Sequence, residues 1–136
     1  MLFRSNGIAF RLETPTSATI HGDPHLLFEA FSNLVANAIK FTPNGGEIFV
    51  RTAHMAAGLR VDIGDSGPGI PSGEREAVLQ RFYRSESGRD PLAQGYGLGL
   101  SIVSAIVRLH GFRLRIDDNA GGGARLTVEC WVEAIT

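Results

Sequence analysis

Apolar and polar positions repeat along the chain with two different periods, one typical of helices and one typical of strands. A 3.6-residue period predicts a helix that begins at the capping pair Asp23-Pro24 and runs to about Phe41. A second helix is predicted over 98–110, between Gly97 and Gly111, and a short one over 74–80. Alternation with a period of two predicts strands over 7–12, 18–21, 47–52, 59–65, 112–116 and 125–132.

The order of these elements predicts an α+β fold, with one layer of helices on a mixed, mostly antiparallel sheet. A chain of 136 residues suits one core, so residues 1–136 are expected to form a single domain. The first long helix is amphipathic, because apolar and polar residues gather on opposite sides at 100° per residue. Its apolar side carries Leu27, Phe31, Leu34, Val35 and Ala38, and its polar side carries Glu29, Asn33, Asn37 and Lys40.

Composition restricts the class of protein. Apolar residues make up 43% of the chain and charged residues 20%, and no apolar run approaches the roughly 20 residues that span a bilayer. The amino terminus lacks the features of a secretory signal, so we expect a cytoplasmic setting without direct membrane contact. A net charge of -1 without a basic stripe argues against nucleic acid as a partner. The single cysteine, Cys130, lies in an alternating segment and is expected to be a structural thiol.

Two glycine-rich turns lie downstream of the polar helix face. The first is Asp65-Ser-Gly67-Pro-Gly69-Ile70, at the end of a predicted strand, and the second is Gly95-Tyr96-Gly97-Leu98-Gly99-Leu100, at the start of a predicted helix. Glycines allow the backbone to approach a base or a phosphate closely, and a helix amino terminus favours anions. The second turn is neither a Walker A loop nor a dinucleotide fingerprint, because the residues that complete those motifs do not follow it. Together the turns predict a nucleotide site.

Four segments in this order resemble the ATP-binding catalytic domain of sensor histidine kinases, within the Bergerat-fold group of kinases, gyrases, heat-shock chaperones and mismatch-repair ATPases. They are an N box, Asn33-Leu-Val-Ala-Asn37-Ala-Ile-Lys40-Phe41; a G1 box, 65–70; an F box, Arg81-Phe82-Tyr-Arg84; and a G2 box, 95–100. The resemblance covers nearly the whole chain. It implies a Bergerat-type α/β sandwich and ATP and Mg²⁺ as ligands.

The resemblance also implies roles for individual residues. Asp65 would accept a hydrogen bond from the exocyclic amine of adenine, and Asn37 would bind Mg²⁺, which prefers oxygen ligands. Asn33 would orient a metal-bound water, with Glu29 in the same network, and Lys40 would neutralise phosphate charge. The other implied nucleotide contacts are Phe41, Gly67, Gly69, Ile70, Phe82, Gly95, Tyr96, Gly97, Leu98, Gly99 and Leu100.

The polar segment 81–94 contains few apolar residues and is expected to act as a mobile lid. Phe82 would anchor this lid to the domain, and Arg84 would reach the terminal phosphate. Two positions depart from the family pattern. Tyr96 stands where a small hydroxyl residue or a variable one is common, and Ala124 follows Gly123 where Ser or Thr is frequent.

A histidine kinase also needs a phosphoacceptor histidine followed by an acidic and then an apolar residue. None of His21, His25, His54 and His110 stands in that context, so the acceptor is expected on a separate dimerisation domain, in the same or another chain. This domain alone would then be mainly monomeric, and it would act on a response regulator indirectly. Two alternatives stay open: a stand-alone anti-sigma-factor-like serine kinase, and a nucleotide-binding scaffold that no longer transfers phosphate.

Overall fold

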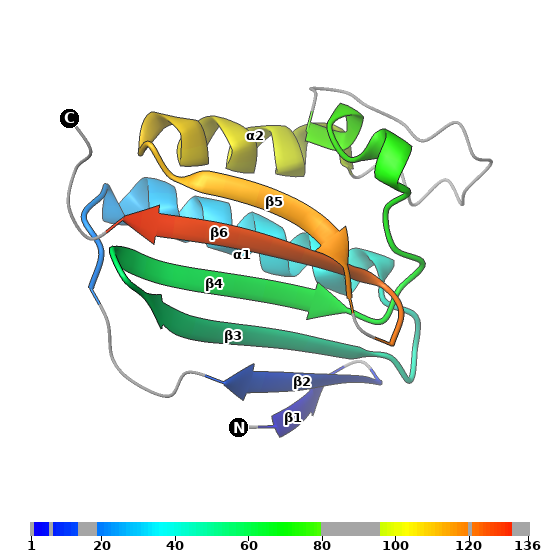
Figure 1. Cartoon of the computed structure of the whole chain (residues 1–136). Helices are drawn as coiled ribbons and strands as arrows, with labels where there is room; N and C mark the ends of the chain where they lie inside the picture. The colour runs from blue at the N-terminus through cyan, green and yellow to red at the C-terminus, as the bar shows by residue number, and fades with distance from the viewer. Residues whose placement is uncertain (1, 6, 14–18, 80–95, 120, 132–136) are drawn as a thin grey trace.

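The described part of the chain forms a helix layer on one face of a six-stranded sheet with the order β1-β2-β3-β4-β6-β5 (Figure 1). The computed structural model describes residues 2–5, 7–13, 19–79, 96–119 and 121–131. The strands are β1 (Leu2–Ser5), β2 (Ile8–Glu13), β3 (Glu47–Met55), β4 (Gly58–Asp65), β5 (Arg113–Asp118) and β6 (Ala124–Trp131). The helices are α1 (Pro24–Phe41) and α2 (Tyr96–Leu109), with short 3₁₀ turns η1 (Ser72–Glu74) and η2 (Ala77–Leu79).

The sheet is mixed but mostly antiparallel, as the sequence predicts. Only β2 and β3 pair in parallel, and the connection between them contains α1. The pairs β1–β2, β3–β4, β4–β6 and β5–β6 are all antiparallel. The antiparallel pairing of β4 with β6 places the end of β4 beside the turn between β5 and β6 (Figure 1). The expected α+β fold is therefore confirmed.

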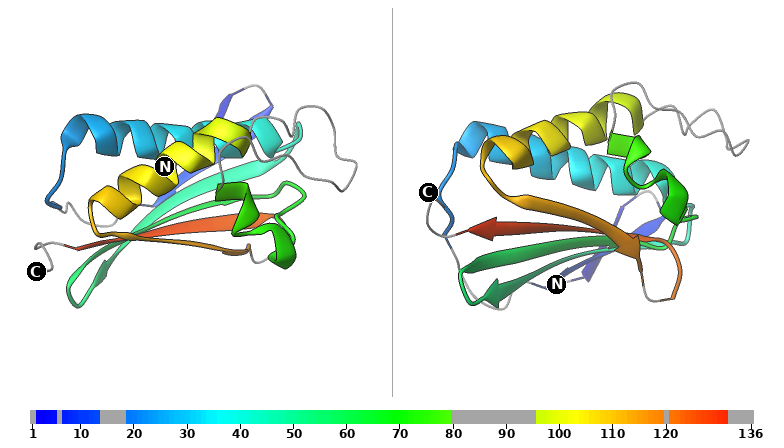
Figure 2. Two further views of the ribbon diagram at one scale, coloured as in Figure 1. Left: turned by 90° about the horizontal axis from the view of Figure 1, so that it is seen from above. Right: turned by 45° about the horizontal axis from the view of Figure 1, so that its top comes forward.

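Both long helices pack on the same face of the sheet (Figure 2). The core between the layers is formed by Leu27, Ala30, Leu34 and Ala38 of α1, Leu100, Val103, Ile106 and Val107 of α2, and inward residues of the sheet such as Ile48, Ile63, Leu126 and Val128. The helices run in opposite directions, because the start of α1 meets the end of α2. At that junction the backbone N–H of Asp23 donates to Nε2 of His110 at 3.0 Å.

The ends of α1 follow from local chemistry. Asp23 caps the helix, because its Oδ1 accepts from the N–H groups of His25 and Leu26 at 2.9 and 3.1 Å. Pro24 occupies the first turn, where a missing N–H costs no hydrogen bond. At the other end the Thr42 hydroxyl donates to the Ala38 carbonyl at 2.7 Å. These contacts confirm the predicted limits of the helix.

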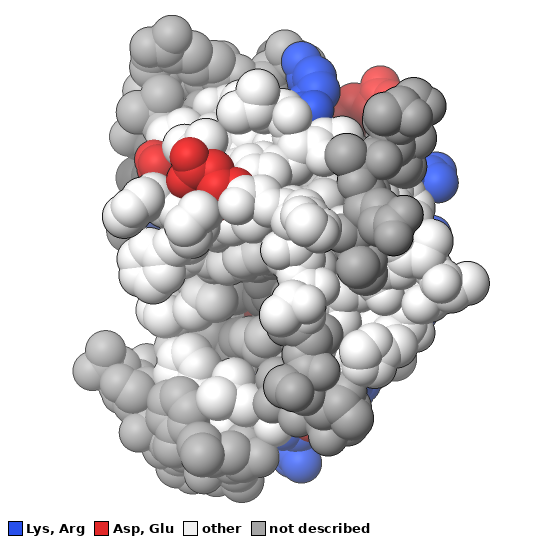
Figure 3. Space-filling view, turned by 90° about the vertical axis from the view of Figure 1, so that its left-hand side faces the viewer, with Lys and Arg blue, Asp and Glu red and all other residues white. Residues whose placement is uncertain are grey.

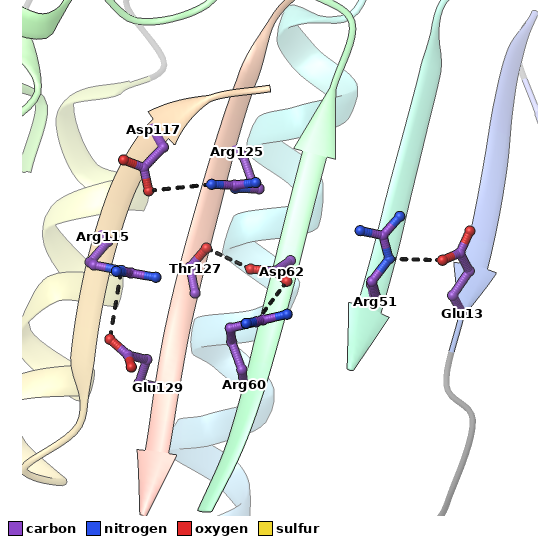
Figure 4. A network of polar contacts seen from close by, with 9 residues as sticks. All are labelled: Glu13, Arg51, Arg60, Asp62, Arg115, Asp117, Arg125, Thr127 and Glu129. Atoms are coloured by element: carbon purple, nitrogen blue, oxygen red, sulfur yellow. Dashed lines mark hydrogen bonds and ion pairs between the residues drawn. The ribbon is translucent and has the colours of Figure 1, made fainter. Parts of the chain in front are cut away.

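The other face of the sheet carries a network of charged side chains (Figure 4). Asp62 is only 5% exposed there. Its burial is compensated because its carboxylate accepts from the Thr127 hydroxyl at 2.6 Å and pairs with Arg60 at 3.1 Å. Arg51 pairs with Glu13 at 2.8 Å across the parallel β2–β3 register. The charges alternate in sign along neighbouring strands, so this face is polar without a large field of one sign.

Two sequence predictions differ from the structure near the amino terminus. The strand expected over 18–21 is wrong, because residues 19–21 form no strand. The parallel pairing of β2 and β3 obliges the chain after β2 to cross over to the start of α1 instead of pairing with the sheet. Conversely, β1 was not expected, although Asn6-Gly7 is a hairpin signal: Ser5 pairs with Ile8, and Gly7 has a φ of 75°.

The short helix expected over 74–80 is instead two 3₁₀ turns, η1 and η2. The N–H of Glu74 bonds to the Pro71 carbonyl at 2.9 Å, and the N–H of Leu79 bonds to the Glu76 carbonyl at 3.2 Å. Val78 alone is fully buried in this stretch. One buried side chain holds a single turn against the core but does not provide the apolar stripe of a longer helix.

In the ranges that the structure covers, neither α1 nor α2 combines the length and apolar character needed to cross a bilayer. The end of the molecule where α1 begins and α2 ends shows few charged side chains among its described atoms (Figure 3). Phe28 in α1 and Leu109 in α2 lie near this end and are 75% and 72% exposed.

The two leucines at opposite ends of α2 predict a contrast in stability. Leu100→Ala removes a side chain with no exposed surface, and we expect it to lower the free energy of unfolding by about 2–5 kcal/mol. Leu109→Ala in the same helix removes an exposed side chain, and its effect should stay within about 0.5 kcal/mol. Urea denaturation of both variants measures the difference. Equal losses would contradict the core described above.

Candidate functional site

A pocket opens between the end of α1, the segment after β4 and the start of β6. Its walls are formed by Asn37, Phe41, Asp65, Pro68, Gly69, Ile70, Ala124 and Leu126. Five of these, Asn37, Phe41, Asp65, Gly69 and Ile70, are site residues that the sequence predicts. The fold thus brings the N box and the G1 box together, although they lie about 30 residues apart in the chain.

Among the described residues, Asp65 is the only carboxylate on the walls of this pocket. It is the last residue of β4 and is 7% exposed. Its Oδ1 accepts from two backbone N–H groups, those of Gly67 at 2.8 Å and Ala124 at 3.3 Å. No described residue donates to Oδ2. Burial raises the pKa of Asp65 above its usual range, and the two N–H groups oppose that rise. Among the described residues, one oxygen is therefore held by the backbone and the other has no protein donor.

Close backbone approaches explain why two glycines are needed around Asp65. A Cβ on Gly67 would overlap the carbonyl oxygen of Phe41 at the end of α1. A Cβ on Gly123 would overlap the carbonyl of Asp65 itself, and Gly123 also has a φ of 97°, a conformation that other residues rarely adopt. The G1 segment can therefore lie directly against α1 on one side and the β5–β6 turn on the other.

Asn33, on the polar face of α1, lies beside the start of α2. Asn33 donates from Nδ2 to the Glu29 carbonyl at 2.8 Å, and its Oδ1 lies 3.6 Å from where a Cβ on Gly99 would be. Asn37, one turn further along, is half-buried on the pocket wall. Glu29 and Lys40 are exposed and do not line the pocket. The N box thus lies beside the start of α2, the helix that begins within the G2 box.

The structure describes the G2 segment and the expected lid only in part. The backbone of Tyr96, Gly97 and Leu98 forms the first turn of α2, but their side chains lie outside the description. Leu100 is fully buried in the core, so its side chain anchors the helix and does not reach the pocket. Gly95, Phe82, Arg84 and the expected lid over 81–94 lie outside the described residues.

Several residues at the site were missed from the sequence. Pro68 and Leu126 line the pocket, and Asn119 and Arg75 hold the segment around Asp65 from outside it. Alternation along β6 was a usable signal for Leu126, because it faces inward two residues after Ala124. No local pattern links Asn119 to Asp65, 54 positions away.

A metal at this site would have few protein ligands. Within the described residues, no group of three or more His, Cys, Asp or Glu side chains is placed to hold a metal ion. Asn37 offers an amide oxygen at the pocket wall, which suits a cation that takes oxygen ligands and obtains the others from water or from a bound anion.

The raised pKa of Asp65 predicts how the free protein responds to pH. The folded state holds this proton more tightly than the unfolded state, so the free energy of unfolding falls as pH rises between the usual Asp pKa and the raised value. Asp65→Asn should remove that fall and be at least as stable as the wild type at neutral pH. Asp62→Asn removes the charge that pairs with Arg60 and weakens the buried hydrogen bond from Thr127, so it should instead lose about 1–3 kcal/mol. Thermal melts from pH 4 to 8 compare them, and a large loss of stability in Asp65→Asn at neutral pH would contradict the assigned cost of burial.

Comparison with known proteins shows the family to which this chain belongs. Residues 22–134 match the model for histidine kinase-, DNA gyrase B-, and HSP90-like ATPases. The chain is 42% identical over 106 residues to the adaptive-response sensory kinase SasA of Nostoc sp., covering 77% of this chain and 26% of that protein. It is 33% identical over 131 residues to the histidine-protein kinase BaeS of Escherichia coli, covering 96% of this chain and 28% of the relative. It thus spans about a quarter of the length of these relatives.

Comparison with solved structures leads to the same family. A mycobacterial sensor histidine kinase, MprB, superposes with a TM-score of 0.80 at 34% identity, over 95% of this chain and 85% of that one. The catalytic domain of histidine kinase ThkA superposes with a TM-score of 0.78 at 28% identity, over 93% of this chain and 81% of that one. The chain belongs to the family of histidine kinase-, DNA gyrase B-, and HSP90-like ATPases, and it has the fold of the ATP-binding catalytic domain of a sensor histidine kinase.

Proposed function

We propose that this domain binds ATP between α1, the G1 segment and α2, and transfers the γ-phosphoryl group to a histidine on a separate dimerisation domain. The observation that carries the proposal is the buried carboxylate of Asp65, with Oδ1 fixed by two N–H groups and Oδ2 without a described donor, on the wall of a pocket shared with Asn37. Family membership and the sensor kinase relatives support the same reaction.

Adenine recognition follows from the pocket walls. Oδ2 of Asp65 would accept a hydrogen bond from the exocyclic amine of adenine, which a guanine carbonyl at the same position cannot donate. Phe41, Ile70, Ala124 and Leu126 contribute apolar surface to the walls. Since the base is flat and largely apolar, a few apolar walls and one directed polar group are sufficient to orient it.

The phosphate groups would lie toward the first turn of α2. The first N–H groups of an α-helix have no partner within the helix, so the start of α2 and its helix dipole would favour an anion there. Lys40 is exposed at the end of α1, where its ammonium group could neutralise phosphate charge. Gly95, Phe82 and Arg84 remain proposed contacts in the part of the chain that the structure does not describe.

We further propose Mg²⁺ as the cofactor, with Asn37 as its protein ligand and ATP phosphates and water as the others. The bound ion would offset the negative charge on the transferring phosphoryl group. The amide oxygen of Asn37 fits this role because Mg²⁺ commonly uses one or two protein oxygens together with phosphate. Asn33 would orient a metal-bound water, since its own amide is already fixed by the Glu29 carbonyl. Glu29, exposed one turn earlier, would belong to the same network.

The phosphoacceptor must come from elsewhere. His110 uses both ring nitrogens within the fold, one for the Asp23 N–H and one for the Ile106 carbonyl, and none of the four histidines has the acceptor context. A dimerisation domain that carries the acceptor histidine would be the direct partner, and a response regulator the indirect one.

We propose a cytoplasmic location, in a soluble or membrane-anchored sensor, a monomeric isolated domain and no nucleic-acid partner. The sensor kinase relatives favour this function over an anti-sigma-factor-like serine kinase or an inactive scaffold.

The two polar residues of the pocket should respond differently to substitution. Asp65→Asn removes the charged acceptor and should weaken ADP by about 1.5–3 kcal/mol with or without Mg²⁺. Asn37→Asp keeps an oxygen ligand but adds a charge, so it should mainly change the Mg²⁺ dependence of ADP binding. Titration calorimetry at several Mg²⁺ concentrations separates the two effects. If both variants lose affinity equally whether or not Mg²⁺ is present, these roles are wrong.

Phosphoryl transfer can be tested with a supplied partner. Mixed with a dimeric helical phosphoacceptor domain and γ-labelled ATP, the wild-type domain should label that partner, and Asn37→Ala should not. The matched control is the partner with its acceptor histidine replaced by alanine, which should stay unlabelled. ADP binding without transfer to any such partner would favour the scaffold alternative.

A further inference from the structure

The turn between β5 and β6 contacts Asp65 from outside the pocket. Asn119 donates from Nδ2 to the backbone carbonyl of Asp65 at 2.9 Å. The same turn brings the Ala124 N–H to Oδ1 of Asp65 at 3.3 Å. Two backbone bonds close the turn, from Asn119 N–H to the Gly123 carbonyl at 2.9 Å and from Gly122 N–H to the Asn119 carbonyl at 3.0 Å. Asn119 is thus a rigid donor aimed at the main chain of Asp65.

We propose that Asn119 is a positioning residue for adenine recognition, which acts by fixing the backbone of Asp65 so that Oδ2 keeps its direction into the pocket. The inference rests on the proposed role of Asp65 as the adenine acceptor. Asn119 does not line the pocket and does not need to touch the nucleotide. It would affect adenine binding only through its hydrogen bond to the backbone carbonyl of Asp65.

Strand pairing explains why Asp65 needs this support. The β4–β6 pairing ends at Gly64 and Arg125, so Asp65 lies one residue beyond it on that side. On the other side Asp65 still pairs with Ile48 of β3. A carbonyl without a donor is unfavourable where it is buried, and a strand end that is paired on one side only is less constrained than one paired on both. The side chain of Asn119 supplies the donor at the position where the pairing stops.

A second link joins the same two segments but should hold less tightly. Arg75 donates from Nε to the Ile70 carbonyl at 3.2 Å and pairs with Asp118 at 2.6 Å. The Asp118 side chain is 84% exposed, and ion pairs at such positions contribute little to stability. The half-buried hydrogen bond of Asn119 is therefore the stronger constraint on Asp65, and Asp118, the neighbouring residue at the end of β5, provides a control.

The test compares ADP with purine riboside diphosphate, which lacks the exocyclic amine. Asn119→Asp keeps the size of the side chain but cannot donate to a carbonyl, and the new charge faces the Asp65 main chain. We expect it to weaken ADP about tenfold and to leave purine riboside diphosphate within about twofold. Asp118→Asn should leave both ligands unchanged. In an Asp65→Asn background, Asn119→Asp should cause no further loss of ADP affinity, because the coupled acceptor is already altered.

The outcomes separate this proposal from the function on which it rests. If the wild type does not bind ADP, the proposed function fails. If the wild type prefers ADP but Asn119→Asp weakens both ligands equally, Asn119 has only a structural role and the positioning proposal is wrong. Asn119→Ser, which keeps a turn-forming residue, serves as the second variant, with folding checked by circular dichroism. Loss of folding in both variants would also contradict the proposal, because it would assign Asn119 to stability.

Discussion

The burial of one carboxylate, that of Asp65, constrains the rest of the site. A charged group at 7% exposure is unfavourable unless its environment compensates, and here two backbone N–H groups bind Oδ1. Those two donors come from Gly67, just after β4, and from Ala124, at the start of β6. Both segments must therefore lie close to Asp65, and this closeness excludes a side chain at Gly123. The burial that disfavours the charge of Asp65 in the free protein also fixes the direction of this acceptor in the pocket.

The two layers of the fold have different roles around this group. The sheet fixes Asp65 through β3 and the β5–β6 turn, and its outer face is held by ion pairs that take no part in the pocket. Helix α1 adds Asn37 to the pocket wall. The bond between the Asp23 N–H and His110 holds the start of α1 against the end of α2, and the antiparallel packing brings Asn33, in the middle of α1, beside Gly99 near the start of α2. Both helices thus contribute to the position of the face of α1 that we propose to bind the metal, beside the end of α2 that we propose to bind phosphate.

Local sequence signals predicted the helices and strands better than they predicted the contacts between them. Asp23-Pro24 predicted the start of α1 because capping depends only on neighbouring residues, and the N and G1 boxes predicted five residues of the pocket wall. The strand expected over 18–21 was wrong because alternation cannot show that a parallel pair requires a crossover there. Asn119 was missed because its partner lies 54 residues away and the bond uses a backbone carbonyl, which leaves no trace in residue type.

The central claim is that Asp65 is a charged acceptor for adenine, held ready in the free protein at the cost of burial. An NMR titration of the Asp65 carboxyl carbon, with and without ADP, tests it most directly. The account predicts a pKa above the usual Asp range in the free domain, because burial disfavours the charge. ADP should lower that pKa, because an amine donor stabilises the carboxylate. A pKa that is unchanged or raised when ADP binds would contradict the assignment of Asp65 as the adenine acceptor.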